Sequence, residues 1–408
     1  MTKKTANLYL PGDKSIAHRL VLVSLLLNAN ITIRNLPTGQ DVLTSLKIVR
    51  QLGAKVTWLT EQSITITGMN RILSCASSKN EPIIIDCENS GTTVRLLCGI
   101  LANVKGKYIL IGDESLSKRP MERVVKPLSQ LMGVDIKSTE GCLPLYLNST
   151  GICKNTIFEN VTGSAQVKSA VLFAGMAVQG ETRVIEKVCS RDHTERLIEY
   201  FKAHKGENNL KFDVPGDVSS SAYFVVLALI TGKRVCFKNI LLNPLRTGFV
   251  RVLRRMGAVI EEKLISAEWE PVGDLIVDGG CLKATDITAE EIPSVIDELP
   301  ILAIAMAFAK GQSAVSGASE LRIKESDRIS CLISQLKKLG VECEEKADGY
   351  RIIGGNSIKP AELNSFKDHR LAMSFAILAK CANVELNIID KDCVNISFPE
   401  FWEMMGRI

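Results

Sequence analysis

The chain has 408 residues, of which 46% are hydrophobic and 23% charged, which excludes an intrinsically disordered protein and predicts roughly two to three domains. The formal net charge of +5 does not demand a nucleic-acid partner, although it suits small anionic substrates. No apolar run reaches the ~18 residues of a membrane span, and the first residues lack the apolar core of a signal peptide, so we expect a cytoplasmic protein without a membrane partner.

Cysteine occurs twelve times and histidine only four times. No two cysteines stand at the Cys-x-x-Cys spacing of common zinc sites, which argues against a structural metal. Cys98 and Cys331 lie in apolar runs. We therefore expect reduced, buried thiols rather than disulfides or metal ligands.

The first predicted helix follows a turn in the segment LPGDKSIAHRL, residues 10–20. Pro11-Gly12-Asp13 is typical of a turn followed by a helix cap, and the residues after it are apolar enough for a buried helix. The first turns nevertheless carry polar and cationic side chains, namely Lys14, Ser15, His18 and Arg19. Such residues at the start of a buried helix indicate ligand-binding groups.

A pattern of an amphipathic helix, a glycine and a short alternating strand recurs along the chain. The glycine suits a left-handed helix end, and the residues after it alternate as in a half-buried strand. The spacing of mostly ~65–80 residues exceeds that of solenoid repeats, so each copy is a whole unit of strands and helices. The copies centre on Gly53, Gly133, Gly257, Gly340 and a clipped Gly406. A third copy at residues 201–209 is eroded and lacks the strand pair of the others, which gives six units in all.

The Pro-Gly-Asp segment occurs twice, at residues 11–13 and 215–217, each time before a serine and an apolar helix. A chain that crosses twice between two similar domains would show this pattern. We predict a central domain, 13–214, with three repeats of which the third is truncated. It is inserted into a second domain, 1–12 plus 215–408, also with three repeats. The alternative is one repetitive α/β domain in which the second match arises by chance.

Other predicted helices also begin with anion-binding features. Free N–H groups at a helix start, next to a glycine, form an anion nest, and the helix dipole adds positive potential. Arg119 stands just before Pro120, a favoured first helical residue. The cations and polar groups at these starts are Gly91, Arg95, Arg119, Ser164, Gln166, Lys168 and Arg191.

Carboxylates appear before three later apolar helices: Asp297 with Glu298, the run 322–328, and Asp368 with His369 and Arg370. For any one start, helix capping or a solvated charge is a sufficient explanation. Seven such starts in a repeat architecture favour an enzyme or binder for a small molecule with several anionic groups, with carboxylates as proton carriers. The chain contains no phosphate-binding GxxxxGK[ST] loop and no dinucleotide GxGxxG turn.

Taken in order, these segments resemble the 5-enolpyruvylshikimate-3-phosphate synthase (3-phosphoshikimate 1-carboxyvinyltransferase) family nearly end to end. The segments are PGDKSIAHR, NSGTTVRLL, GDESLSKRPM, SAQVKSAVLFAG, SRDHTER, VPGDVSSSAYF, DELPILAIA, ELRIKESDRI, DHRLAMSFA and SFPEF. The resemblance implies an α/β fold of two similar domains, each with three βαβαββ repeats in an inside-out barrel. It places the active site in the cleft between the domains.

The resemblance also implies the reaction, a step of the shikimate pathway toward chorismate and the aromatic amino acids. The enolpyruvyl group of phosphoenolpyruvate passes to the 5-hydroxyl of shikimate 3-phosphate through a tetrahedral adduct, and phosphate is released. It implies small-molecule substrates only, no metal or organic cofactor, and a monomer.

The family's functional residues carry over to matching positions of this chain. The catalytic group is Lys14, Asp297 and Glu325. The shikimate 3-phosphate contacts are Lys14, Ser15, Arg19, Ser164, Ala165, Gln166, Arg191, Asp297 and Lys324. The phosphoenolpyruvate contacts are Lys14, Gly91, Arg119, Gln166, Arg328 and Arg370.

Three features depart from the family: Ala17 replaces a common serine, Ile396 replaces a common lysine, and the third repeat lacks a strand pair. Two alternatives remain. One is the sister enolpyruvyl transferase that acts on UDP-N-acetylglucosamine, against which the SAQVKS, DHR and KSIAHR segments and the lack of a loop cysteine near Arg119 argue. The other is an inactive binding protein, against which the intact Asp297 and Glu325 argue.

Overall fold

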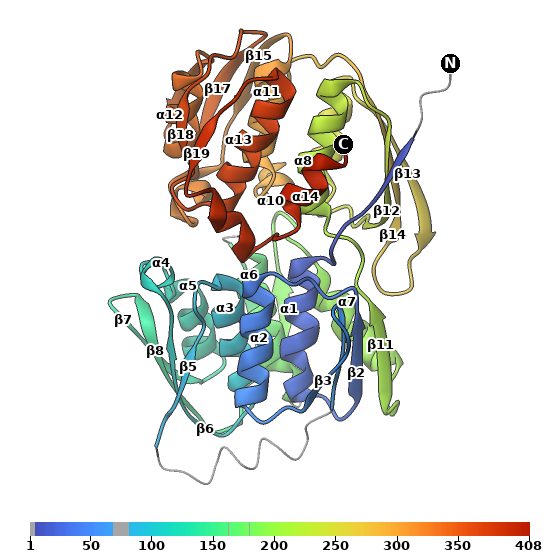
Figure 1. Cartoon of the computed structure of the whole chain (residues 1–408). Helices are drawn as coiled ribbons and strands as arrows, with labels where there is room; N and C mark the ends of the chain where they lie inside the picture. The colour runs from blue at the N-terminus through green and yellow to red at the C-terminus, as the bar shows by residue number, and fades with distance from the viewer. Residues whose placement is uncertain (1–4, 68–80, 162, 179) are drawn as a thin grey trace. The chain divides into compact units, whose positions relative to one another are not determined.

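The computed structural model describes residues 5–67, 81–161, 163–178 and 180–408, and it has a mixed α/β fold (Figure 1). The described chain forms two compact units. The central unit is Gly12–Val214, and the terminal unit combines Met1–Pro11 with Pro215–Ile408. Residues 1–4, on which part of the signal-peptide expectation rests, lie outside the described residues.

Both Pro-Gly-Asp segments cap a helix, as predicted. In the central unit, Asp13 Oδ1 accepts the Ile16 N–H at 3.0 Å at the start of α1 (Lys14–Val23). In the terminal unit, Asp217 Oδ1 accepts the Ser220 N–H at 2.8 Å at the start of α8 (Val218–Thr231). An aspartate that accepts an otherwise unbonded N–H stabilises the first turn of a helix.

The strands of the central unit form three sheets. They are β2 (Asn30–Arg34), β3 (Val56–Thr60), β4 (Ser63–Ile66), β5 (Ile83–Asp86), β6 (Gly106–Ile111), β7 (Asp135–Thr139), β8 (Cys142–Ser149), β9 (Ile157–Glu159), β10 (Arg183–Ile185) and β11 (Asn209–Asp213). Two sheets have four strands, in the orders β11-β2-β4-β3 and β5-β6-β8-β7. The third pairs only β9 with β10, in parallel.

The helices of the central unit pack between these sheets. They are α1, η1 (Ser24–Leu26), α2 (Gln40–Gln51), α3 (Gly91–Leu101), α4 (Glu114–Ser117), α5 (Glu122–Lys126), η3 (Pro127–Leu131), α6 (Ala165–Ala174), η4 (Gly175–Ala177) and α7 (His193–Ala203). Helix α3 packs against α6 and α1, and α1 also packs against α2. Most residues of α1 and α3 are buried, because these helices carry apolar side chains around much of their circumference.

The terminal unit repeats this plan. Its strands are β1 (Ala6–Tyr9), β12 (Val235–Leu241), β13 (Val259–Ser266), β14 (Val272–Asp278), β15 (Gly311–Val315), β16 (Glu342–Lys346), β17 (Gly349–Gly354), β18 (Glu362–Asn364) and β19 (Asn387–Ile389). The sheet orders are β1-β12-β14-β13, β15-β17-β16 and β18-β19. Strand β1 lies parallel to β12, so residues 6–9 complete a sheet whose other strands come after residue 215.

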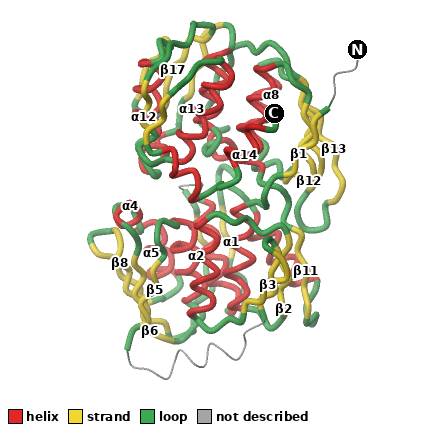
Figure 2. Tube along the Cα trace, viewed as in Figure 1, coloured by secondary structure: helices red, strands yellow, loops and turns green. Residues whose placement is uncertain are grey.

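The helices of the terminal unit enclose a strongly apolar core. They are α8, α9 (Gly248–Arg255), α10 (Ile292–Val295), α11 (Leu299–Phe308), η5 (Ser319–Ile323), α12 (Arg328–Lys338), α13 (His369–Ala382), η6 (Lys391–Ile396) and α14 (Phe401–Gly406). Helix α11 packs against both α8 and α13. Within each unit, most helices gather inside and the strands lie toward the outer margin (Figure 2).

The predicted glycine helix ends are confirmed in four repeats. Gly53, Gly133, Gly257 and Gly340 have φ angles of 101°, 73°, 97° and 83°, the left-handed region that favours glycine. Each is followed within three residues by a strand. Gly406 differs, because it is the last residue of α14 itself.

The predicted shortening of the third repeat is confirmed in the described chain. After α7 the chain enters β11 directly, without a strand pair of its own repeat. Strand β11 pairs in parallel with β2, from Asn209 opposite Asn30 to Asp213 opposite Arg34, and so completes the first sheet instead. The sheet of the third repeat therefore consists of β9 and β10 alone in this part of the chain.

The eleven cysteines that the structure describes are all free thiols. Cys98 is fully buried, and burial raises the pKa of its thiol to about 12, so it packs as a neutral apolar group. The expectation of burial is wrong for Cys189 and Cys281, which are exposed, and is met only in part by four half-buried cysteines, namely Cys142, Cys331, Cys343 and Cys381. Cys75 lies outside the described residues.

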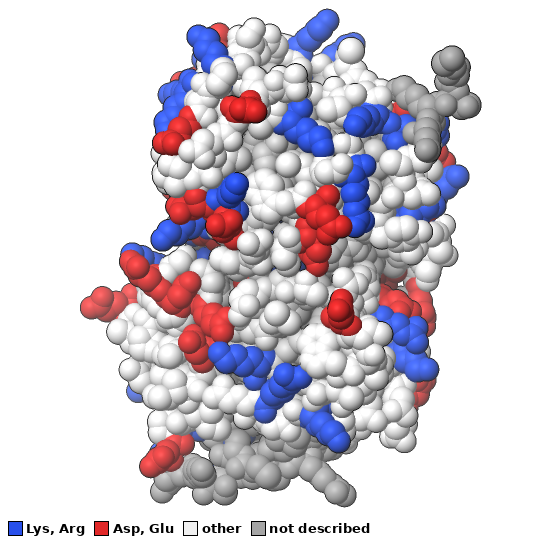
Figure 3. Space-filling model, in the orientation of Figure 1, with Lys and Arg blue, Asp and Glu red and all other residues white. Residues whose placement is uncertain are grey.

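On the face shown in Figure 3, cationic and anionic side chains are interspersed, and outside the grey atoms no region is covered by cations alone. That face therefore offers no continuous basic surface of the kind that binds nucleic acid. Among the described helices, none is both long enough and apolar enough to cross a membrane.

Candidate active site

In the central unit, the starts of α3 and α6 are joined by polar side chains. Arg95 Nη1 donates to Gln166 Oε1 at 2.7 Å, and Gln166 Nε2 donates to Thr92 Oγ1 at 2.9 Å. Arg95 Nη2 also donates to the Pro120 carbonyl at 3.2 Å. We call Gly91, Thr92, Arg95, Arg119 and Gln166 the helix-start cluster. The cluster brings Gly91, Arg119 and Gln166, three predicted phosphoenolpyruvate contacts, together around Arg95. The family resemblance did not assign Arg95 to a substrate.

Gly91, the first residue of α3, lies against two guanidinium groups. A Cβ atom placed on Gly91 would be 3.1 Å from Nη1 of Arg119 and 3.1 Å from Nη1 of Arg95. Both arginines are largely buried, at 8% and 6% exposed. The absence of a side chain at Gly91 therefore leaves backbone N–H groups and two cations beside one another, an arrangement suited to an anion.

Arg119 does not stand at a helix start as the sequence predicted. It lies between α4 and α5, its backbone N–H donates to the Leu116 carbonyl at 3.1 Å, and α5 begins at Glu122 rather than at Pro120. The Arg119 N–H thus bonds to a carbonyl of the last turn of α4. Residues 118–121 then connect α4 to α5.

Lys14, at the start of α1, forms an ion pair with Asp41 of α2. The Asp41 side chain is only 6% exposed, whereas that of Lys14 is 31% exposed. A buried carboxylate thus holds the ammonium at the helix start. No sequence motif marked Asp41, which lies inside a repeat helix.

Arg19 joins three helices of the central unit. Its Nε donates to Thr194 Oγ1 at 2.8 Å, Nη2 to Ser169 Oγ at 2.8 Å, and Nη1 to the Ser15 carbonyl at 2.7 Å. These bonds tie α1 to α6 and α7. Arg19 therefore supports the backbone of Ser15 and the first turns of α6.

His18 is neutral rather than cationic. Burial lowers its pKa to about 3, and Nδ1 lies 2.8 Å from Ser45 Oγ, which in turn lies 2.8 Å from Thr93 Oγ1. The cations at the start of α1 are therefore Lys14 and Arg19 only.

The remaining residues predicted for the central unit lie near the starts of α6 and α7. Ser164 Oγ caps α6 by accepting the Val167 N–H at 3.5 Å, and Ala165 is the first residue of that helix. Arg191 is half-buried in the segment before α7. The structure thus places Ser164, Ala165 and Gln166 consecutively at one helix start.

In the terminal unit, three acidic side chains surround Arg328. Its Nε donates to Asp368 Oδ2 at 2.7 Å, Nη2 donates to Glu325 Oε2 at 2.6 Å, and Nη1 lies 3.7 Å from Asp297 Oδ1. The Arg328 side chain is 2% exposed. Although burial disfavours its charge, Asp368 and Glu325 outweigh that penalty and raise the pKa of Arg328.

Arg370 lies next to the same acidic group. Its Nη1 donates to the Asp297 carbonyl at 2.7 Å, and Nη2 lies 3.7 Å from Asp297 Oδ2. Asp368 caps α13 by accepting the Arg370 N–H at 2.9 Å. We call Asp297, Glu325, Arg328, Asp368 and Arg370 the carboxylate cluster.

Lys324 precedes Glu325 and is half-buried. Desolvation lowers its pKa, although the neighbouring Asp297 opposes this. Asp297 and Glu325 keep 16% and 24% of their side chains exposed, so these two carboxylates can exchange protons while held by arginines. Asp368, by contrast, is fully buried and acts as a support that the sequence did not single out for catalysis.

The structure also describes Ala17 and Ile396, the two positions where the chain departs from common family residues. Ala17 is fully buried in α1, and Ile396 is the last residue of η6, where it is half-buried. Neither replaces a member of the two clusters defined above.

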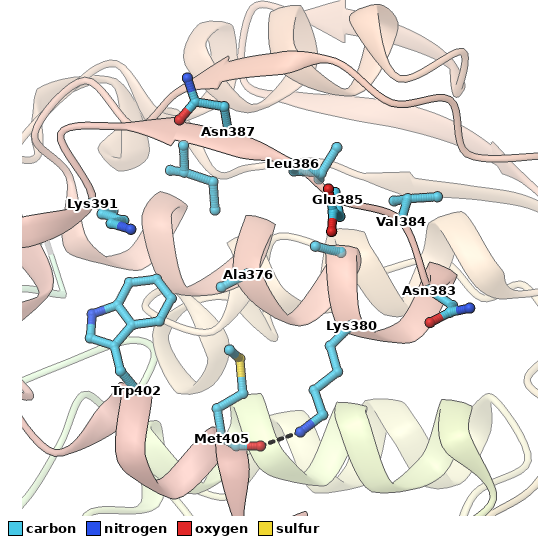
Figure 4. A pocket seen from close by; sticks show the side chains of 12 residues that line it. Ala376, Lys380, Asn383, Val384, Glu385, Leu386, Asn387, Lys391, Trp402 and Met405 are labelled. Carbon is cyan, nitrogen blue, oxygen red and sulfur yellow. Dashed lines mark hydrogen bonds between the residues drawn. The ribbon is translucent and has the colours of Figure 1, made fainter.

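A cavity of about 430 Å³ in the terminal unit lies apart from these residues (Figure 4). It is formed by α13, α14 and the segment 383–391, and no member of the carboxylate cluster lines it. Its two cations already have partners, because Lys380 Nζ donates to the Met405 carbonyl and Lys391 Nζ lies 6.0 Å from the centre of the Trp402 ring. The candidate active site therefore does not include this cavity.

Known proteins resemble the chain over almost its whole length. A family model described as EPSP synthase (3-phosphoshikimate 1-carboxyvinyltransferase) matches residues 2–405. The 3-phosphoshikimate 1-carboxyvinyltransferase of Petrotoga mobilis is 40% identical over 423 residues, covering 99% of this chain and 96% of the relative. The enzyme of that name from Endomicrobium trichonymphae is 41% identical over 416 residues, covering 98% and 96%.

A solved structure shows the same likeness. The EPSP synthase of Acinetobacter baumannii matches with a TM-score of 0.83 at 34% sequence identity, covering 99% of this chain and 96% of the other.

Proposed function

The chain belongs to the EPSP synthase family, and from this membership we propose how its own residues carry out the family's reaction. The protein transfers the enolpyruvyl group of phosphoenolpyruvate to shikimate 3-phosphate, in the shikimate pathway. The family is the one expected from the sequence, rather than the sister family that acts on UDP-N-acetylglucosamine.

The proposed route is addition followed by elimination. The 5-hydroxyl oxygen of shikimate 3-phosphate attacks C2 of phosphoenolpyruvate and loses its proton, while C3 gains a proton. The tetrahedral adduct then loses phosphate from C2 and a proton from C3, which restores the double bond. The two substrates carry two phosphates and two carboxylates, so the site needs fixed cations and positioned proton carriers.

Shikimate 3-phosphate is assigned to Lys14, Ser15, Arg19, Ser164, Ala165, Gln166, Arg191, Asp297 and Lys324. The buried bonds of Arg19 support this, since they order Ser15 and the first turns of α6. The helix starts at Lys14 and Ala165 supply N–H groups that favour a phosphate.

Phosphoenolpyruvate is assigned to Lys14, Gly91, Arg119, Gln166, Arg328 and Arg370. The two guanidinium groups beside Gly91 support this assignment in the central unit. In the terminal unit, Arg328 and Arg370 are charged and held in place by carboxylates, so they reorganise little when an anion binds.

Lys14, Asp297 and Glu325 are the proposed catalytic residues. Asp297 takes the proton of the 5-hydroxyl, Glu325 handles the C3 proton, and Lys14 contacts both substrates. The observation that carries this assignment is that one buried guanidinium, Arg328, contacts both Asp297 and Glu325. The proton carriers are thereby fixed beside a group proposed to bind phosphoenolpyruvate.

The variant Glu325→Gln tests this role. Glutamine keeps the size of the side chain and an oxygen for Arg328, but it cannot carry the proton, so kcat should fall by about 10²- to 10⁴-fold. Calorimetric affinities for both substrates should stay within about threefold of wild type.

Glu344→Gln is the matched control. It makes the same change at an exposed carboxylate of β16 that pairs with Arg351 at 3.1 Å, and it should leave kcat unchanged. A near-normal kcat in Glu325→Gln would remove Glu325 from the proton path. Tight binding of both substrates without turnover in wild type would support the inactive binding protein instead.

We further propose that the two units are the two domains predicted as 13–214 and 1–12 plus 215–408. The division of the described chain at residues 11–12 and 214–215 supports this. We propose a cytoplasmic monomer whose partners are its two small-molecule substrates, and the free thiols of the described cysteines suit a reducing compartment.

A further inference from the structure

Glu186 is the centre of a polar network at one edge of the two-stranded sheet. Strands β9 and β10 run in parallel with Glu159 opposite Ile185, so the next residues, Asn160 and Glu186, leave the sheet side by side. The segments that follow them lead into α6 and α7, which carry Ser164 and Arg191 on or just before their first turns. Carboxyl edges of parallel strands are common places for ligands.

The Glu186 carboxylate accepts four hydrogen bonds. Oε1 accepts from Asn160 Nδ2 at 2.6 Å and from Ser190 Oγ at 2.6 Å. Oε2 accepts from Lys168 Nζ at 2.8 Å and from the Ser190 N–H at 3.0 Å. Four bonds fill the acceptor capacity of a carboxylate, and charge-assisted bonds of this kind are strong and directional.

The network reaches the helix start proposed to bind shikimate 3-phosphate. Asn160 Nδ2, besides bonding Glu186, donates to the Ser164 carbonyl at 3.2 Å. Lys168 Nζ, besides bonding Glu186, donates to the Ser190 carbonyl at 3.2 Å. Glu186 thus connects the residue before α6 with the segment before α7 through two bridges.

The polar network of Glu186 lies beside the short ladder of the shortened repeat. The other two sheets of the central unit have four strands each, whereas β9 and β10 form only a three-residue ladder in the described chain. The Lys168 and Glu186 side chains are 4% and 8% exposed, so their pairing is shielded from solvent. A buried charged pair fixes geometry where the backbone ladder is short.

We propose that Glu186 is a positioning residue for shikimate 3-phosphate: it holds Ser164 and the Ser190–Arg191 segment in the arrangement that receives this substrate. The inference rests on the proposed assignment of Ser164 and Arg191. It adds a residue that touches no substrate and acts through Asn160, Lys168 and Ser190.

Glu195 provides a matched comparison on the same lysine. Its Oε1 lies 2.6 Å from Lys168 Nζ, but it projects from α7 and its side chain is 33% exposed. Glu186 differs in that it also accepts from Asn160 and from two groups of Ser190. Neutralising either glutamate leaves Lys168 with one carboxylate partner. Comparing the two variants therefore distinguishes the effect of a lost charge from the effect of lost positioning.

The experiment compares Glu186→Gln with Glu195→Gln in steady-state assays of phosphate release. In Glu186→Gln the KM for shikimate 3-phosphate should rise about tenfold or more, while the KM for phosphoenolpyruvate and kcat stay within about threefold. In Glu195→Gln all three constants should stay within about threefold. An unchanged shikimate 3-phosphate KM in Glu186→Gln, or an equal rise of both KM values, would overturn the positioning role.

Asn160→Ala covers the case in which Glu186→Gln fails to fold. It leaves the Lys168–Glu186 pair intact and removes the two amide bonds by which Asn160 links Glu186 Oε1 to the Ser164 carbonyl, and the same selective rise is expected. Equal changes in both KM values would overturn the proposal.

The variant Ser164→Ala distinguishes a wrong assignment of shikimate 3-phosphate to Ser164 from a wrong positioning role for Glu186. If Ser164→Ala raises the shikimate 3-phosphate KM and Glu186→Gln does not, only the positioning role is wrong. If Ser164→Ala leaves that KM unchanged, the assignment of α6 and the inference built on it both fall.

Discussion

The two clusters of the candidate site hold their arginines in opposite ways. In the helix-start cluster of the central unit, Arg95 is bonded by neutral oxygens, those of Gln166 and Pro120. In the carboxylate cluster of the terminal unit, Arg328 is bonded by the ionisable oxygens of Asp368 and Glu325.

This difference indicates that the arginines of the two clusters have different roles. The neutral partners of Arg95 do not offset its positive charge, although Lys14 of the same unit does pair with a carboxylate, Asp41. Arginines surrounded by carboxylates instead fix acidic groups in place, and those that stay partly exposed can exchange protons. We propose that Arg95 offers its charge to an anionic substrate, and that Arg328, besides its proposed contact with phosphoenolpyruvate, also positions the carboxylates of Asp297 and Glu325.

The largest stability difference should come from replacing one buried arginine in each cluster by methionine. Arg328→Met leaves Asp368 buried without its charge partner and should lower the free energy of unfolding by about 3–5 kcal/mol. Arg95→Met removes bonds to neutral groups and should cost about 1–3 kcal/mol. Urea unfolding followed by circular dichroism measures both, and equal losses would show that the two environments do not differ as described.

A smaller effect is the pH dependence of stability that comes from His18, a residue of the central unit outside both clusters. His18 of the central unit has a folded pKa of about 3 against 6.5 in the unfolded chain, so the unfolded state binds the extra proton first. This contribution to stability is complete above pH 6.5 and is lost as the pH falls toward 3, at about 1.4 kcal/mol per pH unit.

Urea unfolding of His18→Asn between pH 6.5 and 4 should show a slope reduced by about one proton relative to wild type. If His18→Asn keeps the wild-type slope, His18 is not the buried neutral group described. The arginines of the carboxylate cluster stay charged over the whole range and add no such slope.

The smallest predicted effect concerns Gly91, where a methyl group would lie 3.1 Å from two guanidinium nitrogens. Gly91→Ala should raise the KM for phosphoenolpyruvate by about tenfold or less, because the arginines must shift by a few tenths of an ångström. The KM for shikimate 3-phosphate should change little. Gly406→Ala, where no atom lies within 4 Å, is the control, and a rise confined to shikimate 3-phosphate would reverse the assignment.

Local signals in the sequence predicted much of this arrangement. Aspartate caps at Asp13 and Asp217 and the left-handed glycines such as Gly53 depend on only a few neighbouring residues, so their conformations follow from local chemistry. The repeated Pro-Gly-Asp segment and the missing strand pair could also be recognised in the sequence, because each is confined to a short stretch of residues. The start of α5 was misplaced, because Pro120 suits a helix start and a turn equally well.

The side-chain pairs that complete the clusters could not be predicted in this way. Asp41 holds Lys14 from another helix, and Gln166 meets Arg95 although 71 positions separate them. Glu186 meets Asn160 because β9 and β10 lie in register, and it meets Lys168 because α6 packs nearby. Such contacts are set by tertiary packing, which a single sequence does not display.

The most direct measurement is phosphate release by the purified protein with phosphoenolpyruvate and shikimate 3-phosphate, each alone and together. Our account predicts release only when both substrates are present, and its loss in Glu325→Gln but not in Glu344→Gln. Release from phosphoenolpyruvate alone, or no release although both substrates bind, would contradict it.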